Sequence, residues 1–240
     1  MNITLFIISM FILSMIIYKN AYQNNTLTCN KYVMNTYLYI ALSLLIVSTT
    51  VMILDKYISF SQFFNNYSYL ALFISTIIFL ISTMTISPER TIIKHLSWGF
   101  FILLIGISLY PAYKLGKITN MLYPTLITTI LLVGFLTLVA FYNPNLISLS
   151  MGPVLITSLF IGILLNMFIY LMGITQYHWY SNILSYIFIF IFCLLLLYDT
   201  KKLQINSKNC VVPDYINESI GIFLDIINLF SNILSVKTYK

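Results

Sequence analysis

The stretches IFIFIFCLLLLYD, residues 187–199, and ESIGIFLDIINLFSNIL, residues 218–234, decide the fold class of this chain. Their apolar residues are continuous rather than alternating, which favours membrane-spanning helices over the strands of a barrel. Asp199 ends the first stretch and Asp225 lies in the middle of the second. A carboxylate at bilayer depth costs about 2.5–3.5 kcal/mol on insertion scales. Both acids are therefore candidates for a function, typically in an ion or proton path.

Composition supports an integral membrane protein. The 240 residues are 60% hydrophobic and 8% charged, with a mean hydropathy of +0.95, whereas soluble domains are about 25% charged. The net charge of +6 does not indicate nucleic-acid binding, because the basic residues are scattered and the longest cluster is Lys201-Lys202. Lysines in loops that flank membrane spans explain the charge. The bias towards Ile, Asn, Tyr, Lys and Phe is typical of an AT-rich genome, such as that of a parasite, an endosymbiont or a large DNA virus.

Eight apolar segments with short polar connections predict a helical bundle that takes up nearly the whole chain. The first segment has neither a basic region before it nor a typical cleavage site, which favours an uncleaved spanning or anchoring helix over a signal peptide. The segments run at about residues 2–18, 35–54, 67–87, 96–112, 121–142, 152–173, 182–199 and 217–236.

The distribution of lysine and arginine predicts the orientation. If all eight segments span, one side carries seven basic residues and the other five. The positive-inside rule then places Arg90 and the loop 200–216 in the cytosol, with both termini outside. Cys29 and Cys210 fall in loops on that same side, so we expect reduced thiols there and no disulfide framework.

The last apolar segment carries one polar stripe. Its members recur at spacings of three and four residues, which places them on one face of a helix. Lipid cannot solvate such a face, so the last helix is expected to be central and to turn the stripe towards other helices or a wet cavity. A hydrogen-bonded seam between helices, without transport, is the alternative. The stripe consists of Glu218, Gly221, Asp225, Asn228 and Asn232.

Asp199 and Asp225 belong to consecutive segments joined by one loop, so the two carboxylates are able to approach each other. Two carboxylates in a low-dielectric site share a proton and titrate as a unit, and in the ionised form they are candidate calcium ligands. Arg90, the only arginine, is the predicted counter-charge of Asp199 through a charge-assisted hydrogen bond. Alternatively, Lys201-Lys202 pairs with Asp199, and Arg90 pairs with Glu89 or anchors the surface.

Three strings resemble the transmembrane BAX inhibitor motif family, which includes the Lifeguard and Golgi anti-apoptotic proteins. LLLLYDTKKL (194–203) and GIFLDIINLFSNIL (221–234) match its last two helices, and FILLIGISLYPAYK (101–114) is similar to its third. The similarity is strong over about 195–236, fair over 88–114 and limited to hydropathy elsewhere.

The resemblance implies a seven-helix bundle around a central last helix, acting as a pH-sensitive calcium leak that modulates calcium homeostasis and cell death. The paired aspartates of the family fall on Asp199 and Asp225, and its arginine falls on Arg90. The chain departs from the family in having eight apolar segments instead of seven. The segments from 35–54 to 217–236 match the seven, so we predict an extra N-terminal helix and loop over 1–34 and the family domain over 35–240. Expected partners are the lipid bilayer, calcium ions and apoptosis-regulating membrane proteins. The expected location is an endomembrane or viral membrane, or the plasma membrane of a bacterium.

Two other functions are possible for a membrane protein with paired acids. An intramembrane aspartyl protease also places acids in consecutive helices, but its Gly-x-Gly-Asp motif is replaced here by Gly221-Ile-Phe-Leu-Asp225, and no Pro-Ala-Leu motif follows. Serine-protease, H-E-x-x-H and phosphate-loop motifs are missing as well, so we expect no enzyme and no cofactor other than calcium as a permeant ion. A structural or interaction protein of a membrane, without transport, stays open.

Overall fold

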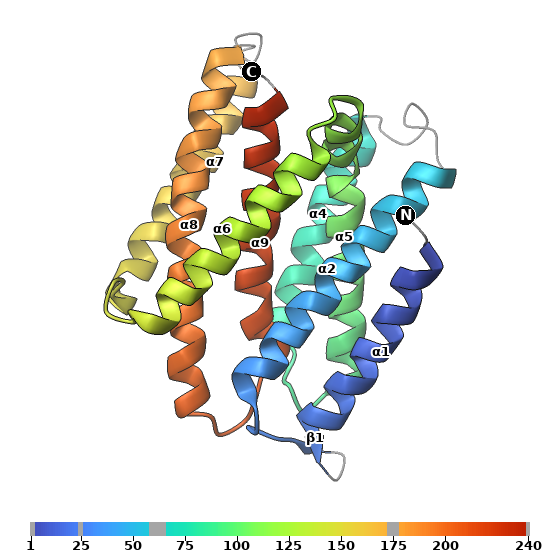
Figure 1. Ribbon diagram of the computed structural model, residues 1–240, viewed down its shortest axis with the longest axis vertical. Coiled ribbons are helices and arrows are strands. Elements are labelled where there is room, and N and C mark those ends of the chain that lie inside the picture. Colours follow the sequence, from blue (N-terminus) through green and yellow to red (C-terminus); the bar gives the residue numbers. More distant parts are fainter. Residues whose placement is uncertain (1–2, 24–25, 58–65, 172–177, 239–240) are drawn as a thin grey trace. The chain divides into compact units, whose positions relative to one another are not determined.

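The computed structural model describes residues 3–23, 26–57, 66–171 and 178–238. The described part consists of α-helices and their connections, with one short antiparallel strand pair, β1 (Tyr22–Gln23) and β2 (Thr26–Leu27), and a 3-10 turn, η1 (Leu149–Met151) (Figure 1). The predicted all-α membrane fold is therefore confirmed. The α-helices are α1 (Ile3–Ala21), α2 (Tyr32–Tyr57), α4 (Asn66–Thr85), α5 (Thr91–Ile118), α6 (Leu122–Tyr142), α7 (Gly152–Leu171), α8 (His178–Lys208) and α9 (Tyr215–Thr238).

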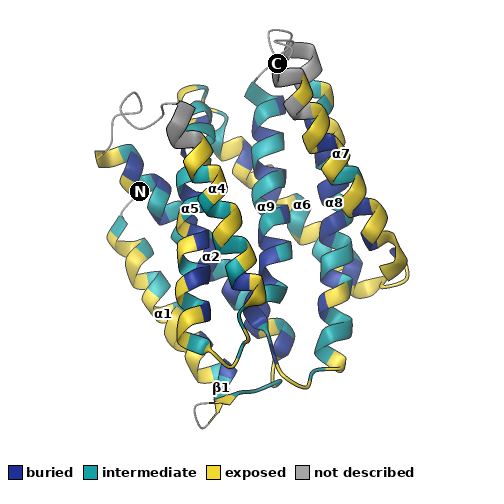
Figure 2. Ribbon diagram, turned by 180° about the vertical axis from the view of Figure 1, so that it is seen from behind, coloured by how far each residue is buried: buried dark blue, intermediate teal, exposed yellow. Residues whose placement is uncertain are grey.

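Each of the eight apolar segments forms a helix, because a helix satisfies its backbone groups internally where no water is present. Six of these helices are long and apolar enough to cross a membrane: α1, α2, α5, α6, α8 and α9. In the most apolar part of α9, 56% of the residues are buried, against 6% for α1. Figure 2 shows the same contrast, with exposed residues along α1 and buried ones along α9. The polar last helix is thus the most enclosed of the six.

The chain divides into two compact units. Unit 1 comprises residues 1–114 and 207–220, and unit 2 comprises residues 115–206 and 221–240. Three helices (α5, α8 and α9) continue from one unit into the other along the sequence. Each unit is described by itself below.

Within unit 1, Gly106 allows a close approach between α2 and α5. A Cβ atom built on Gly106 would lie 2.9 Å from the Cβ of Thr50, which is closer than real side chains pack. Gly106 is one of the two residues that carry the resemblance of 101–114 to the family. The other, Pro111, lies inside α5, where its missing N–H leaves one helical hydrogen bond unformed.

The predicted end of the seventh apolar segment, 182–199, differs from the structure. The apolar run stops at Asp199, but α8 continues to Lys208, so Asp199 lies inside the helix and not at its end. Contacts within unit 2 explain the extension: Leu203 is fully buried, and the Gln204 side chain donates a hydrogen bond to the Ala140 carbonyl. The predicted loop 200–216 shrinks to residues 209–214, which we call the α8–α9 connection.

The prediction of reduced thiols at Cys29 and Cys210 is wrong. These cysteines form a disulfide in unit 1, with a sulfur–sulfur distance of 2.06 Å and a Cα–Cα distance of 5.9 Å. They are 181 residues apart in sequence, so no local pattern indicates the pairing. Cys193 is a free, half-buried thiol within the apolar run of α8.

Candidate functional site

Asp225 lies in α9 with only 4% of its surface exposed. Among the described residues, its Oδ2 atom has no hydrogen-bond partner. A buried polar atom without a partner costs free energy, and an ionised carboxylate costs more than a neutral group. Such an atom needs a proton, a cation or water to compensate it, which makes Asp225 the centre of the candidate site.

Asp199 reaches the same face of α9 from α8, within unit 2. A Cβ atom built on Gly221 would overlap Asp199 Oδ2 and lie 3.0 Å from its Cγ. Gly221 precedes Asp225 by four residues, so the two share one face of the helix. Asp199 therefore meets α9 one turn before Asp225, and the two carboxylates interact electrostatically. We call Asp199 and Asp225 the acid pair.

The neighbours of Asp199 in α8 are held by the other helices of unit 2. Lys201, the alternative partner of Asp199, directs its Nζ to the Ile147 carbonyl at 2.5 Å. The Tyr198 side chain lies against Gly152 at the start of α7. These contacts orient α8 on both sides of Asp199.

The amides of the stripe form hydrogen bonds within their own helix. Asn228 Nδ2 donates to the Leu224 carbonyl, and Asn232 Nδ2 donates to the Asn228 carbonyl. One donor of each amide thus serves α9 itself. Glu218, the first member of the stripe, is half-buried in the unit 1 part of α9.

No group of three or more metal-ligating side chains (His, Cys, Asp or Glu) gathers within the residues that the structure describes. The acid pair supplies carboxylate oxygens, the ligand type that calcium prefers, but two residues do not fill its usual six to eight positions. The acid pair by itself is therefore not a complete calcium site, and calcium enters the proposal as a permeant ion.

Arg90, the predicted counter-charge of Asp199, lies in the turn between α4 and α5. Its backbone N–H donates to the Ser87 carbonyl and its side chain is exposed. Arg90 belongs to unit 1 and Asp199 to unit 2, so their interaction stays a prediction.

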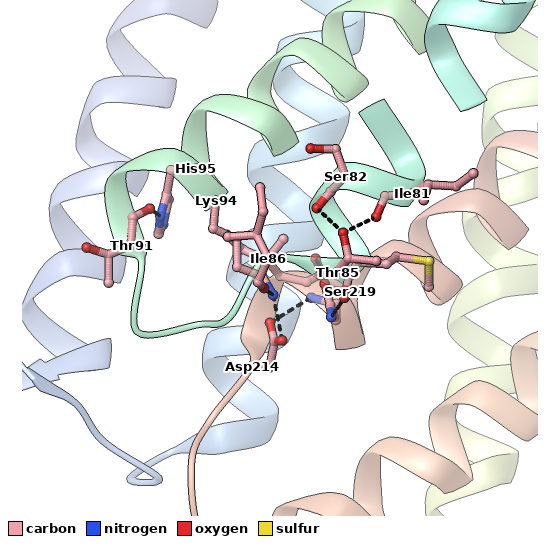
Figure 3. A network of polar contacts seen from close by, with 12 residues as sticks. Ile81, Ser82, Thr85, Ile86, Thr91, Lys94, His95, Asp214 and Ser219 are labelled. Atoms are coloured by element: carbon pink, nitrogen blue, oxygen red, sulfur yellow. Dashed lines mark hydrogen bonds and ion pairs between the residues drawn. The ribbon is translucent and has the colours of Figure 1, made fainter. Parts of the chain in front are cut away.

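A second polar network, in unit 1, was not foreseen from the sequence (Figure 3). Lys94 in α5 is 2% exposed, and its Nζ donates to Asp214 Oδ2 at 2.6 Å and to the Ile86 carbonyl after α4 at 2.8 Å. Asp214 Oδ1 accepts the backbone N–H of Asn217 at 3.2 Å and so caps the start of α9. One ion pair thus joins the ends of three helices.

Next to this ion pair lies a cluster of rings, in which Tyr39 and Tyr215 are buried and His95 is half-buried. His95 Nδ1 lies 2.6 Å from the Thr91 carbonyl, which only accepts, so Nδ1 is the donor. His95 Nε2 shares a 2.7 Å hydrogen bond with the Tyr39 hydroxyl. Tyr39 also stacks on Tyr215, the first residue of α9, with ring centroids 6.2 Å apart. A cavity of about 10 Å³ beside these residues has room for one water molecule and no larger ligand.

One local signal for this network was present in the sequence. Pro213-Asp214 directly before an apolar helix is typical of an N-terminal cap. Lys94, in contrast, was counted as a loop lysine, because its partner lies 120 residues further along the chain. The count of seven basic residues on the predicted cytosolic side therefore includes one that is inside the fold.

Long apolar helices define a multi-pass α-helical membrane protein, and two of its consecutive helices carry the acid pair. Residues 29–238 match the family model described as inhibitor of apoptosis-promoting Bax1. The chain belongs to this family, and the resemblance drawn from its last two helices is confirmed. No curated protein matches the chain at a significant level. Helix α1 precedes the matched residues, and the domain boundary between residues 34 and 35 stays a prediction.

Proposed function

We propose that this protein is a proton-regulated calcium leak of a membrane rather than an enzyme, with the acid pair in its ion path. The main support is Asp225, a carboxylate that is almost fully buried and whose Oδ2 has no partner among the described residues. Asp199 adds a second negative charge on the same face of α9. Two negative charges at low dielectric attract a divalent cation strongly.

Protons and calcium compete for the same oxygens in this proposal. When a proton binds, the acid pair keeps a single negative charge and attracts a cation less. The leak then depends on pH, because the pH sets the fraction of acid pairs that carry a proton. Membership of a family described as inhibiting apoptosis-promoting Bax1 also supports a role in limiting cell death, through the calcium content of the compartment that the protein drains.

The test is calcium flux through the full-length protein, reconstituted in liposomes that enclose a calcium dye, over a series of pH values. The wild type is expected to show a pH-dependent leak. Asp225→Asn is expected to hold the leak at the wild-type low-pH level at every pH, because the amide mimics the protonated acid. Asn228→Ala, three residues further on the same stripe, removes no charge and should keep the wild-type profile. A wild type without flux supports the structural alternative, and an unchanged profile in Asp225→Asn removes the acid pair from the mechanism.

Arg90 is proposed as the residue that stabilises the ionised form of Asp199. A planar guanidinium holds a carboxylate with two parallel hydrogen bonds, which an ammonium does not reproduce. Arg90→Lys is therefore expected to shift the pH profile of the leak partly, and Arg90→Ala to shift it fully, with folding retained in both. If lysine substitutes without any effect, Arg90 only anchors the turn at the membrane surface.

A further inference from the structure

The ring cluster of unit 1 gives His95 a defined tautomer. Its Nδ1 donates to the Thr91 carbonyl at 2.6 Å (Figure 3), and its Nε2 lies 2.7 Å from the Tyr39 hydroxyl. Because a neutral imidazole carries a single N–H, Nε2 has no hydrogen and accepts the hydrogen of Tyr39. Both ring nitrogens of His95 are thus bonded to protein groups, and Nε2 is the one that is able to take up a further proton.

Tyr39 connects this nitrogen to a second tyrosine. Tyr39 is only 1% exposed, so the group that is bonded to Nε2 is itself shielded from water. Its hydroxyl also forms a hydrogen bond with the Tyr22 side chain. Since the single hydrogen of the Tyr39 hydroxyl goes to His95, Tyr22 is the donor in this second bond. The hydrogen bonds therefore all point one way, from Tyr22 through Tyr39 to His95.

The Tyr22 end of this chain of hydrogen bonds lies near the surface of unit 1. Tyr22 is in β1, directly after α1, and is half-buried beside the exposed Gln23. The Tyr18 ring stacks on the Tyr22 ring, with centroids 5.3 Å apart. Burial raises the pKa of the Tyr22 hydroxyl above its usual value, so Tyr22 keeps its hydrogen at neutral pH and is able to donate it. The hydrogen bonds thus run from a partly exposed hydroxyl to a shielded nitrogen.

We propose that Tyr22, Tyr39 and His95 form a proton relay, through which His95 takes up a proton from water as a second proton-binding site apart from the acid pair. A proton from water binds the Tyr22 oxygen, the former Tyr22 hydrogen passes to the Tyr39 oxygen, and the former Tyr39 hydrogen passes to His95 Nε2. One proton enters, both tyrosines end as neutral hydroxyls, and the imidazole gains one positive charge. Each hydrogen bond is kept, with its donor and acceptor exchanged. Imidazole suits the end of such a relay, because it is the side chain that ordinarily titrates near neutral pH.

The charged groups beside His95 link this site to the start of α9. Lys94, the preceding residue, interacts electrostatically with His95 and repels a second positive charge. The Asp214 carboxylate, 2.6 Å from Lys94 Nζ, offsets this repulsion. A positive charge on His95 therefore acts on the ion pair that caps α9. The titratable groups around His95 and the relay are Lys94 in α5, Tyr39 in α2, Tyr22 in β1, Asp214 in the α8–α9 connection and Tyr215 in α9.

The tautomer is tested by nitrogen NMR of the full-length protein in lipid nanodiscs, with isotope-labelled histidine, over a pH series. The chain has two histidines, His95 and His178, so the variant His178→Gln assigns the signals of His95. In the neutral form of His95 we expect a protonated Nδ1 and an unprotonated Nε2, and at lower pH a proton on both nitrogens. A neutral form with its proton on Nε2, or a His95 that takes up no proton before the protein unfolds, would overturn the proposal.

The relay is tested by the rate at which His95 gains and loses its proton, measured by NMR relaxation dispersion at half-protonation. Tyr22→Phe removes the outer hydroxyl but leaves Tyr39 on Nε2, so the tautomer should stay the same. The exchange rate should fall by about a hundredfold, because a positioned proton donor speeds proton transfer by about 10²–10⁴-fold.

The control is Tyr57→Phe at the end of α2, where the side chain is 69% exposed, and its exchange rate should equal that of the wild type. A wild-type rate in Tyr22→Phe would mean that protons reach Nε2 by another route, such as the water-sized cavity beside Asp214, and would overturn the relay. Neither NMR readout involves calcium flux, so both are independent of the proposed leak.

Discussion

Gly221→Ala is expected to abolish the normal pH response of the leak, because an added Cβ occupies the place of the Asp199 carboxylate. The Asp199 side chain has to move away from α9, which separates the acid pair. Alanine in a helix normally stabilises by about 0.5–1 kcal/mol relative to glycine, whereas overpacking costs about 1–3 kcal/mol. We therefore expect a net destabilisation together with the altered leak, measured by thermal unfolding and by calcium flux over a pH series.

The matched control for this substitution is Gly134→Ala in α6, also in unit 2. A Cβ atom built on Gly134 meets nothing within 4 Å, so neither the leak nor its pH profile should change. Its unfolding midpoint should stay the same or rise slightly. A Gly221→Ala protein that keeps the wild-type flux and pH profile would show that the approach of Asp199 to α9 has no part in the leak.

Lys94→Met is expected to give a large loss of stability. It removes the buried ammonium that holds Asp214 and the Ile86 carbonyl, and so leaves two acceptors without their donor. Unsatisfied buried groups cost about 1–3 kcal/mol each. The cost for Asp214 is at the lower end of this range, because its side chain is 24% exposed. For a chain of this size, the unfolding midpoint in detergent should fall by about 3–10 °C.

The control is Lys114→Met, which removes a second ion pair described in unit 1, between Lys114 and Asp55 at 3.0 Å. The Lys114 side chain is 34% exposed, against 2% for Lys94, whereas the Asp55 side chain is 11% exposed. Because water reaches the Lys114 side of the pair, its midpoint should fall less than that of Lys94→Met. Equal effects of the two substitutions would mean that burial does not set the importance of the Lys94 pair.

The helices were predictable from the sequence because hydropathy is a local property. All eight apolar segments became helices, since continuous apolar residues leave the backbone no other way to form its hydrogen bonds in lipid. The two acids were also found, because a carboxylate within an apolar run stands out without any knowledge of its neighbours. The boundaries of the helices were less predictable. Helix α8 continues beyond Asp199 to Lys208, because contacts of Leu203 and Gln204 stabilise this extension.

The sequence by itself thus determined the membrane class, the family and the identity of the acids. Only the tertiary structure decided that Gly221 receives Asp199, that Lys94 pairs with Asp214 and that Cys29 pairs with Cys210. The physical reason is distance along the chain. A charge or a thiol looks the same in sequence whether it faces water or a partner more than a hundred residues away, and only packing chooses between the two.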